Sequence, residues 1–290
     1  MNKSVFITGG NRGIGLELCK KFAFEYNFKV YMGARNLDKA KEAIKILGTA
    51  NNIIPIEIDV EFEKSISNAY EEYLRLKDRD EKLYIFINNA AAQLDWIPNK
   101  KHIKTLEIPI ELLDRIYRIN VFAPILTTRY FLESYEKNSR IVNVVSGSGE
   151  FWDPNAEKDF QIGYAATKSA LMMVTKKLSA AVKNRNIYVN CACPGWCQTS
   201  MGGGEAPLTA SDGADSIIKA CFLGNENPPT GKYFRNGIRI PIDIYYPTQV
   251  LDEYKKFEIV KKNIDKLAWW IPIRKWRDNF RNKILNADQT

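Results

Sequence analysis

Short runs of consecutive apolar residues alternate along the chain with longer segments in which apolar residues recur every three or four positions. The short runs are typical of strands buried on both faces, and the longer pattern is typical of amphipathic helices. In the first third of the chain the pattern predicts strands at 3–8, 29–33, 53–58 and 83–87, separated by helices at 16–24, 37–47 and 63–76. This alternation predicts an α/β fold built on a doubly wound parallel sheet.

The rest of the chain continues this rhythm as far as residue 245. The pattern predicts a helix from about 109 to 135 that Pro124 kinks or divides, a strand at 140–145, a helix that carries Tyr164 and Lys168, a strand at 187–193, a helix near 211–223 and a last strand at 231–234. No internal repeat and no linker interrupts the sequence. We therefore expect one domain over residues 1–245.

Residues 246–290 form a basic extension that this fold does not need. Apolar residues recur there at helical spacing, so we predict a helical C-terminal tail. Within 251–290 ten Lys and Arg residues face six Asp and Glu residues, which accounts for half of the net charge of +8. Such a stripe can lie on an anionic membrane surface. Its more common use, which we favour, is to dock on its own domain or on a partner subunit.

Composition narrows the environment of the protein. With 45% hydrophobic and 26% charged residues, the chain has enough apolar material for a sizeable core. We see no secretory signal and no apolar run long enough to cross a membrane. An odd number of cysteines without a disulfide-like framework indicates a reducing compartment, so we expect a cytoplasmic protein. The basic excess alone does not make a nucleic acid a favoured partner.

A cluster of cysteines near the predicted strand at 187–193 raises the question of a metal site. Cys191, Cys193 and Cys197 lie close in sequence, but the only histidine of the chain, His102, is distant. We favour the alternative that these are small buried thiols of a strand, and we expect no metal. Cys193 and Cys197 could still be reactive or modified, although we do not favour this.

A glycine-rich turn joins the first predicted strand to the first predicted helix. It reads Gly9-Gly10-Asn11-Arg12-Gly13-Ile14-Gly15. Between a strand and a helix, such glycines let backbone amides approach a pyrophosphate at the positive end of the helix. The spacing differs from the usual Gly-x-Gly-x-x-Gly, so the turn indicates a Rossmann-like dinucleotide site mainly through its context.

The residues after the second strand bear on the choice of cofactor. An enzyme that selects NAD usually has an acidic residue about 20 positions after the turn. This chain has Ala34-Arg35-Asn36 there, with no acid before Asp38, and a second arginine, Arg12, stands inside the turn. Two guanidinium groups can bind a 2′-phosphate in a forked geometry. The pattern therefore favours NADP(H) over NAD(H), unless both arginines are merely solvated.

Polar and small residues follow the other predicted strands in the same way. Asp59 and Val60 follow the third strand, and the segment from Asn88 to Ala90 follows the fourth. Ligands of doubly wound sheets bind beyond the carboxyl ends of the strands. Because these residues all stand at such ends, we expect them to lie around one site.

Tyr164 and Lys168 are four residues apart on a predicted helix and therefore share one face. In a cleft, the ammonium group can favour the phenolate and lower the pKa of the tyrosine. A tyrosine tuned in this way can give or take a proton near neutral pH. A solvated helix face would produce the same pair, so its meaning depends on the other residues of the site.

Over roughly residues 3 to 235 the chain resembles the short-chain dehydrogenase/reductases. The motifs of that family stand in order: the turn from Thr8 to Gly15, Asp59, Asn88-Asn89-Ala90, Asn120, Ser146, Tyr164-x-x-x-Lys168 and Pro194-Gly195. The turn, Ala34-Arg35 and Cys193-Pro194-Gly195-Trp196 are most similar to the NADPH-dependent carbonyl reductase branch. Ala91 stands where the family has glycine. Only 17 residues separate Ser146 from Tyr164, so the long insert of some monomeric members is absent. Monomer and homo-oligomer both remain open.

The resemblance implies a role for each residue of a catalytic tetrad. Tyr164 is expected to be the general acid, and Lys168 to bind the nicotinamide ribose and depress the pKa of Tyr164. Ser146 is expected to donate a hydrogen bond to the developing oxyanion. Asn120 is expected to hold a water that relays protons to Lys168. The cofactor is expected to lie against Gly9, Asn11, Arg12, Gly13, Ile14, Gly15, Arg35, Asp59, Val60, Asn88, Ala90, Tyr164, Lys168, Pro194, Gly195 and Thr199.

The substrate is expected to be a small molecule with a carbonyl or alcohol group. Large apolar side chains stand in loops expected near the mouth of the cleft: Trp96, Phe151, Trp152, Trp196 and Met201. Apolar walls suit a hydrophobic ketone or aldehyde, although these side chains could instead pack the loops together. We expect an NADPH-dependent reductase. The alternatives are an NADP-dependent dehydrogenase of a secondary alcohol, such as a steroid or retinoid, and a non-catalytic protein that senses NADP(H).

Overall fold

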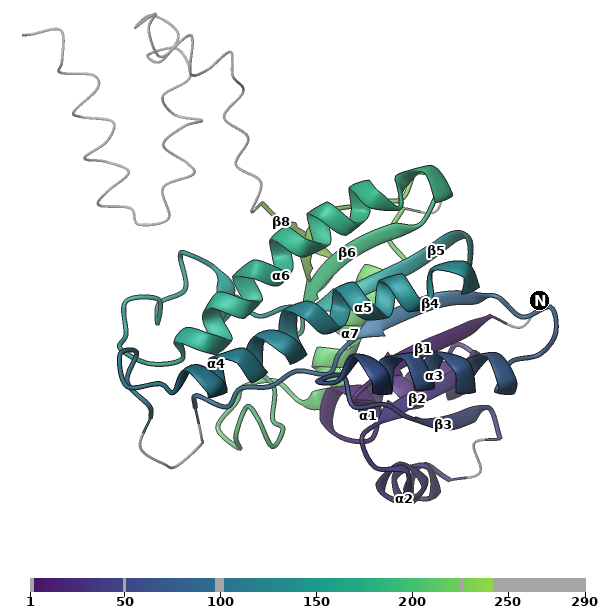
Figure 1. Cartoon of the computed structure of the whole chain (residues 1–290), viewed down its shortest axis with the longest axis horizontal. Helices are drawn as coiled ribbons and strands as arrows, with labels where there is room; N and C mark the ends of the chain where they lie inside the picture. The colour runs from purple at the N-terminus through teal and green to yellow at the C-terminus, as the bar shows by residue number, and fades with distance from the viewer. Residues whose placement is uncertain (1–2, 49–50, 97–101, 225–226, 242–290) are drawn as a thin grey trace, which may run out of the picture. The chain divides into compact units, whose positions relative to one another are not determined.

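The computed structural model describes residues 3–48, 51–96, 102–224 and 227–241. One sheet of eight strands runs through this part of the chain in the order β3-β2-β1-β4-β5-β6-β7-β8 (Figure 1). The strands are β1 (Ser4–Thr8), β2 (Lys29–Ala34), β3 (Ile53–Glu57), β4 (Leu83–Asn88), β5 (Tyr135–Val144), β6 (Tyr188–Cys193), β7 (Tyr233–Arg235) and β8 (Ile238–Ile240). All neighbours pair in parallel except β7 and β8. The predicted doubly wound parallel sheet is therefore confirmed.

Helices cover both faces of the sheet. One face carries α1 (Gly13–Phe24), α2 (Leu37–Leu47) and α7 (Ala210–Cys221), and the other carries α3 (Glu63–Leu76), α4 (Ile110–Tyr117), α5 (Ala123–Tyr130) and α6 (Ile162–Ala181). Because the strands are buried on both faces, their sequences are apolar without alternation, which is the pattern read from the sequence.

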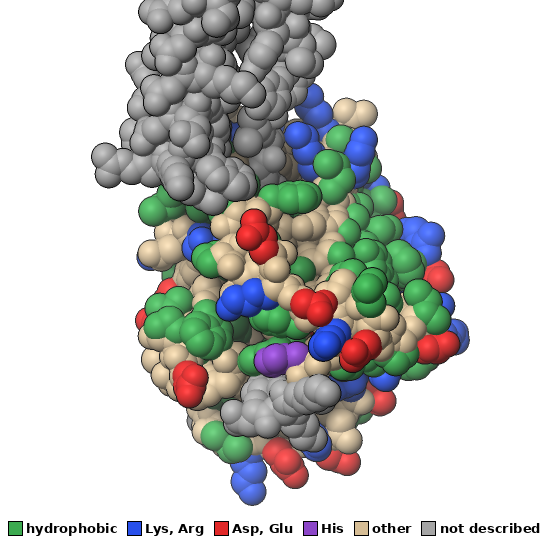
Figure 2. Space-filling view, turned by 90° about the vertical axis from the view of Figure 1, so that its left-hand side faces the viewer, with side chains coloured by type: hydrophobic (Ala, Val, Ile, Leu, Met, Phe, Trp, Pro, Cys, Tyr) green, Lys and Arg blue, Asp and Glu red, His purple; other side chains and the backbone are tan. Residues whose placement is uncertain are grey.

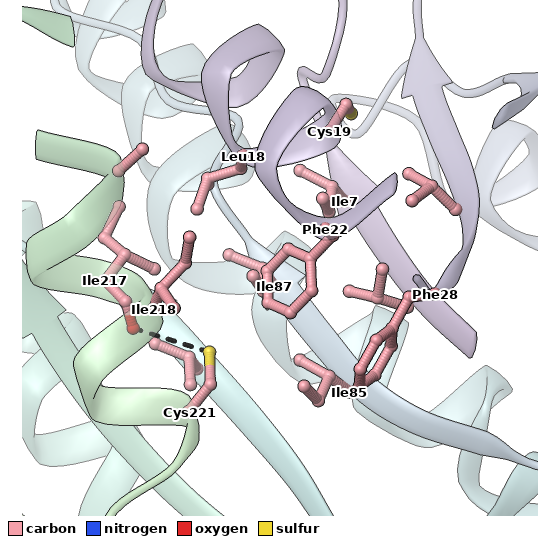
Figure 3. Packing of buried hydrophobic residues seen from close by; sticks show 14 of the residues in the cluster. Ile7, Leu18, Cys19, Phe22, Phe28, Ile85, Ile87, Ile217, Ile218 and Cys221 are labelled. Atoms are coloured by element: carbon pink, nitrogen blue, oxygen red, sulfur yellow. Dashed lines mark hydrogen bonds between the residues drawn. The ribbon is translucent and has the colours of Figure 1, made fainter. Parts of the chain in front are cut away.

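Two hydrophobic clusters fill the space between helices and sheet. On the first face, Leu18 and Phe22 of α1 pack with Ile217 of α7 over Ile7 and other strand residues (Figure 3). On the second face the core is mainly aromatic. Phe6 stacks on Phe86 with ring centroids 5.0 Å apart, and further rings from α3 and α5 adjoin them. Both clusters hold the strands in register, so the loops at the strand ends have fixed starting points.

The chain departs from the predicted helix at 109–135 in an informative way. The helix is divided as expected, but the break is a π-helical turn at Arg118–Phe122, and Pro124 stands in the first turn of α5. α5 ends at Tyr130, and β5 begins at Tyr135, five residues before the predicted start. The aromatic residues between 130 and 135 suit both a helix and a strand, so the sequence pattern places this boundary poorly.

The closing strands were also predicted incompletely. The last predicted strand, at 231–234, corresponds to β7, and the sequence pattern missed β8, which turns back antiparallel to it. The compact unit that holds the sheet ends at Ile240. The predicted helical tail at 246–290 lies outside the described residues.

Because β1 to β7 are parallel, their carboxyl ends share one edge of the sheet, where the loops after β1, β2, β3, β4, β5 and β6 meet. Figure 2 views the molecule from the left-hand side of Figure 1, and it shows hydrophobic and charged side chains interspersed on that face.

Candidate active site

The glycine-rich turn between β1 and α1 lies at the carboxyl edge of the sheet. The Gly10 N–H donates to Gly33 O at 2.9 Å, which holds the turn beside the end of β2. A Cβ atom on Gly15 would lie only 2.1 Å from Gly9 O, so the close approach of the turn to α1 requires glycine. α1 has no capping side chain and no acidic residue in its first turn. Its first N–H groups are therefore suited to an anionic group such as a phosphate.

Two further segments close around this turn. Thr8 Oγ1 accepts hydrogen bonds from Asn89 N and Ala90 N, both at 3.0 Å, and Asn89 Nδ2 donates to Thr8 O at 2.9 Å. Thr199, from the loop after β6, lies so close to Gly13 that a Cβ there would be 3.3 Å from Thr199 Cγ2. The ends of β1, β4 and β6 thus meet at one place, as the strand-end argument required.

The two arginines predicted to bind a 2′-phosphate are both exposed. Neither Arg12 nor Arg35 has a hydrogen bond or ion pair to another described side chain. Arg35 does act on Glu61, whose pKa is lowered mainly by its bond with Arg115 and further by Arg35. The two guanidinium groups therefore remain able to bind an anion.

The other residues predicted to contact the cofactor after β1 and β3 differ in the exposed fraction of their side chains. Ile14 is partly buried against the core cluster of α1, and Asn11 is also partly buried. Val60 lies in the second core cluster, and only 8% of it is exposed. Asp59 is half-buried, and its Oδ1 accepts a hydrogen bond from Glu61 N at 3.0 Å. Asp59 thereby shapes the turn after β3.

Asn88 belongs to a buried polar network rather than to the surface of a cleft. Its Nδ2 donates to Asn143 Oδ1 at 2.8 Å, and its Oδ1 accepts from Thr127 Oγ1 at 2.8 Å. Asn143 in turn donates to Thr175 on α6 at 2.9 Å. The Asn88 side chain therefore ties β4 to β5 and α5, and only its backbone is left for contact with a ligand.

Tyr164 and Lys168 lie on the buried face of α6. The tyrosine is 9% exposed and the lysine 2%. Lys168 Nζ lies 5.5 Å from the centroid of the Tyr164 ring and donates to Val144 O at 2.8 Å. The predicted pair therefore faces the carboxyl end of β5, and the alternative of a solvated helix face is wrong.

Ser146 follows β5 and starts a short 3₁₀ turn at Gly147–Gly149. Its Oγ accepts from Ser148 N at 3.2 Å, and its interaction with Tyr164 opposes the rise that burial causes in the pKa of the tyrosine. A Cβ atom on Gly149 would lie 2.7 Å from the backbone of Lys168. Glycine at this position lets the turn rest directly on α6, which brings Ser146 to Tyr164.

Asn120 lies in the π-helical turn between α4 and α5 and is 1% exposed. Its side chain bonds both backbone groups of Ala92, with Oδ1 accepting from N and Nδ2 donating to O, each at 2.8 Å. Nδ2 also donates to Thr167 Oγ1 on α6 at 3.0 Å. The π-turn, a feature often found at functional sites, thus joins the loop after β4 to the helix that carries Tyr164.

The electrostatics of the pair differ from the expectation. Burial raises the pKa of Tyr164 to about 12, with the Ser146 bond acting against it and the charges of Cys193 and Asp95 adding to it. Burial also lowers the pKa of Lys168 to about 8. The expected lowering of the Tyr164 pKa by Lys168 is thus not seen. Desolvation is the largest cause of the raised Tyr164 pKa, because it disfavours the charged phenolate, and Lys168 is not among the groups that lower this pKa.

The predicted substrate residues are placed unequally. Trp96 is partly buried and stacks on His102 with ring centroids 5.8 Å apart, and His102 stacks on Phe160 at 5.0 Å. This stack ties the loop after β4 to the segment before α6. Packing of the loops, the alternative considered for Trp96, therefore describes its contacts well.

The other aromatic residues remain more open. Phe151 is 94% exposed, Trp196 54% and Trp152 38%. Trp196 Nε1 donates to Gly202 O at 2.8 Å, which fixes its loop, and Met201 is partly buried in the same loop. These side chains supply apolar surface on the loops after β5 and β6.

Pro194 and Gly195 follow β6 directly, and Gly195 N donates to Cys193 Sγ at 3.3 Å. Burial raises the pKa of Cys197 to about 11, which disfavours the reactive thiolate. Among residues 3–48, 51–96, 102–224 and 227–241 there is no cluster of three His, Cys, Asp or Glu side chains that could hold a metal ion.

Three positioning residues were missed as members of the site. Thr8 and Asn89 appear in the sequence only as parts of motifs, and Asp95 carries no pattern that marks it. Their partners are mostly backbone groups distant in sequence, such as the N–H of Gly163 for Asp95. Contacts with distant backbone groups leave no periodic signal in a single sequence.

The doubly wound sheet thus brings this tyrosine, lysine and serine together at its carboxyl edge. Residues 3–207, more than half of the chain, match the model of the short chain dehydrogenase family. The chain therefore belongs to that family, as its motifs predicted. No helix in the described segments is both long and apolar enough to cross a lipid bilayer.

The chain is similar to several known proteins. It is 32% identical over 241 residues to the short-chain dehydrogenase anuI of Penicillium roqueforti, covering 79% of this chain and 92% of the relative. It is 25% identical over 284 residues to (+)-neomenthol dehydrogenase of Arabidopsis thaliana, covering 79% and 94%. Its fold matches the NADPH-bound carbonyl reductase from chicken fatty liver with a TM-score of 0.70 at 24% identity, over 80% of this chain and 95% of the other. The carbonyl reductase Sniffer of D. melanogaster matches with a TM-score of 0.68, also at 24% identity, over 80% and 96%.

Proposed function

We propose that the protein transfers a hydride from NADPH to the carbonyl carbon of a small hydrophobic ketone or aldehyde. The observation that carries this proposal is the cluster of buried Tyr164 and Lys168 with partly buried Ser146, at the same carboxyl edge of the sheet as the glycine-rich turn. The carbonyl reductases among the structural neighbours support the same direction of reaction.

NADP(H) fits the residues at the carboxyl edge. The uncapped start of α1 and its glycine turn suit a pyrophosphate, and Arg12 and Arg35 suit a 2′-phosphate. Asp59, Val60 and the backbone at Asn88 and Ala90 line the neighbouring strand ends, and Pro194, Gly195 and Thr199 approach from the loop after β6. When bound, NADPH supplies the hydride.

Tyr164 donates its proton to the carbonyl oxygen. With a pKa of about 12, Tyr164 holds this proton at neutral pH. Ser146 is placed to donate a hydrogen bond to the same oxygen, where negative charge develops. Lys168, whose pKa is lowered to about 8, can give and take a proton near neutral pH. It is therefore suited both to bind the nicotinamide ribose and to restore the proton of Tyr164, with Asn120 holding the relay water.

The substrate is selected by the loops after β5 and β6. Phe151, Trp152, Trp196 and Met201 provide apolar surface there, with Trp96 as part of the supporting stack. The loop from Pro194 to Leu208, which carries Trp196 and Met201, contains one charged residue, Glu205, so a hydrophobic carbonyl compound is favoured there over a charged one.

The same site can run in reverse as an NADP-dependent dehydrogenase of a secondary alcohol. The similarity to (+)-neomenthol dehydrogenase supports this second candidate. Tyr164 then takes a proton as a base, and oxidation speeds up as pH rises, because the phenolate is needed.

One assay tests the proposal. NADPH absorbance is followed with a panel of hydrophobic ketones and aldehydes, using wild-type protein and Tyr164→Phe. We expect turnover by the wild type and a loss of about 10²- to 10⁴-fold in kcat for the variant, because the proton donor is gone. Turnover of no carbonyl, or equal rates for the two proteins, would refute the reductase function.

The choice of cofactor is tested in the same assay. We expect NADPH to be preferred over NADH, and Arg35→Ala to raise KM for NADPH about tenfold or more with little change for NADH, because a charge-assisted bond to the 2′-phosphate is lost. A wild-type preference for NADH contradicts the proposed role of Arg12 and Arg35.

A further inference from the structure

The helix that carries Tyr164 and Lys168 begins without a cap of its own. The residue at its N-cap position, Gln161, has left-handed backbone angles, with φ 61° and ψ 27°, and makes no capping bond through its side chain. No acidic residue stands in the first turn of α6. The first N–H groups of a helix need acceptors when they are buried. Gly163 and Tyr164, whose N–H groups are among these, are both buried.

The missing acceptor comes from a distant segment. Asp95, in the loop after β4, is 1% exposed, and its Oδ2 accepts from Gly163 N at 2.7 Å and from Tyr164 N at 3.0 Å. The carboxylate thus bonds the backbone of the proposed proton donor itself. A negative group at the start of a helix also interacts favourably with the positive end of the helix dipole.

The packing around this contact leaves little freedom. A Cβ atom on Gly163 would lie 3.1 Å from Asp95 Oδ2 and 2.7 Å from Ile116 Cδ1 of α4. Glycine at 163 therefore allows α6, α4 and the loop after β4 to meet closely. Asp95 is held in one place, and so is the backbone that it bonds.

We propose that Asp95 is a positioning residue, which caps α6 from the loop after β4 and thereby fixes Tyr164 in the site. The inference rests on the proposed function, in which Tyr164 is the proton donor. It adds a residue that acts through the tyrosine without touching the substrate.

The second carboxylate oxygen indicates that the charge of Asp95 has a use beyond capping. Asp95 Oδ1 is buried and has no hydrogen-bond partner in the described part of the chain. A neutral asparagine could accept the same two N–H bonds through one oxygen. A buried carboxylate with a bare oxygen is costly, yet its negative charge helps the nearby tyrosine to keep the proton that it must donate.

In the described part of the chain, three groups act on the pKa of Tyr164: Ser146 from the end of β5, Cys193 from β6 and Asp95 from the loop after β4. Lys168 Nζ, on α6 itself, lies 5.5 Å from the centroid of the Tyr164 ring. Burial is the largest cause of the raised pKa of Tyr164, the Ser146 bond lowers it, and the charges of Cys193 and Asp95 raise it. Removal of the Asp95 charge alone should therefore lower the pKa of Tyr164.

The experiment compares Asp95→Asn, which keeps an acceptor oxygen, with Asp95→Ala, which does not. The pKa of Tyr164 is read from the tyrosinate absorbance of each protein, minus that of the same protein with Tyr164→Phe. We expect Asp95→Asn to lower this pKa, and the pH above which carbonyl reduction declines to fall with it. We expect Asp95→Ala to lower kcat in addition, by about tenfold or more, with KM nearly unchanged, because Tyr164 is misplaced.

Asp212→Asn is the matched control. Asp212 belongs to the capping box at the start of α7, where its side chain accepts from Thr209 N at 2.8 Å. We expect a loss of thermal stability in this variant without a change in the Tyr164 titration. The proposal is overturned if Asp95→Ala keeps both the kcat and the Tyr164 titration of the wild type, or if Asp212→Asn changes both equally. The titration needs no substrate, so a wild type that reduces no carbonyl refutes the proposed function while the titration still decides the role of Asp95.

Discussion

A partly buried lysine, Lys29, lies at the amino edge of the sheet and a buried one, Lys168, at the carboxyl edge, and their pKa values shift in opposite directions. At the amino edge, Lys29 donates to Glu81 at 2.9 Å and to Asp78 at 3.1 Å, and Tyr31 donates to Glu81 at 2.8 Å. Burial acts to lower the pKa of Lys29, but the bonds from the two carboxylates outweigh it, and the pKa is raised. We call Lys29, Tyr31, Asp78 and Glu81 the amino-edge cluster.

At the carboxyl edge, Lys168 donates to the backbone oxygen of Val144 and to no carboxylate among the described residues. Burial therefore lowers its pKa to about 8. For both lysines burial acts to lower the pKa, and both ammonium groups donate hydrogen bonds to oxygen atoms. They differ in the presence of a carboxylate partner. A paired buried charge supports the structure, whereas an unpaired one is held ready to change its protonation state, which is typical of active sites.

The largest expected effect separates the two lysines by activity. Lys168→Met should lower kcat by about 10²- to 10⁴-fold, because the proposed proton relay and the proposed ribose contact are lost. Lys29→Met should leave kcat within about threefold of the wild type, because the amino-edge cluster is at the opposite edge of the sheet from Tyr164. Steady-state kinetics with a carbonyl substrate measures both. A comparable fall in kcat in both variants would mean that activity depends on both edges of the sheet.

Lys168→Met should raise the free energy of unfolding, although it lowers kcat. The folded-state pKa of about 8 lies below the ordinary lysine pKa of 10.5, so between these pH values the unfolded chain binds a proton that the folded chain does not. Wild-type stability should therefore rise with pH across this window. Lys168→Met should be more stable than the wild type by roughly 3 kcal/mol below pH 8, and the gain should shrink as pH approaches 10.5. Urea unfolding at several pH values measures this, and a constant gain would contradict the assigned cause.

The amino-edge cluster should show the opposite pattern. Glu81→Gln leaves the ammonium of Lys29 without its buried partner, and we expect a loss of about 3 kcal/mol in the free energy of unfolding. The pH profile of activity should stay unchanged. Urea unfolding at pH 7 and a kcat profile test this prediction. An unaltered unfolding midpoint would show that the cluster is not a structural support.

These two regions were not equally visible in the sequence. Tyr164 and Lys168 stand at helical spacing, and Ser146 and the glycine turn follow apolar runs, so local patterns and a family resemblance predicted them. Lys29 begins a strand, and Glu81 lies in a polar segment before β4, so no local pattern joins them. Their bond depends on the parallel pairing of β2, β1 and β4. The sheet could be predicted, but not which charged side chains it brings together.

The same limit applies inside the site. The resemblance predicted a lowered pKa for Tyr164, but burial raises this pKa instead. The depth of burial depends on the packing of α6 on β5 and β6, which the sequence does not show. The π-helical turn at Asn120 also escaped prediction, because a single extra residue in a helix changes the hydrophobic period too little to be recognised. Features that arise from packing, such as the burial of Tyr164 and the π-helical turn, are harder to predict from the sequence than the identity of the site residues.

The smallest expected effect concerns Glu150, whose charge is paired as at the amino edge although it lies next to the turn after Ser146 at the carboxyl edge. Glu150 is 6% exposed and accepts hydrogen bonds from Tyr233 and Arg235, so its charge is paired, as at the amino edge. The turn after Ser146 lies against the same guanidinium, since a Cβ on Gly147 would be 3.2 Å from Arg235 Nη2. Glu150 therefore both supports the structure and holds the turn that starts at the serine.

Glu150→Gln should accordingly give an intermediate result. We expect a loss of about 1–2 kcal/mol in stability, because the guanidinium keeps only a neutral partner, and a fall in kcat of no more than about tenfold, because the Ser146 turn loosens. Tyr233→Phe is the control, since it keeps the Arg235 pair and should change kcat less. Urea unfolding and steady-state kinetics on the same preparations measure both quantities. If Glu150→Gln lowers stability and leaves kcat unchanged, the paired charges beside the site act as those of the amino-edge cluster do. The difference between the two regions then depends on whether a charge is paired and not on its distance from Tyr164.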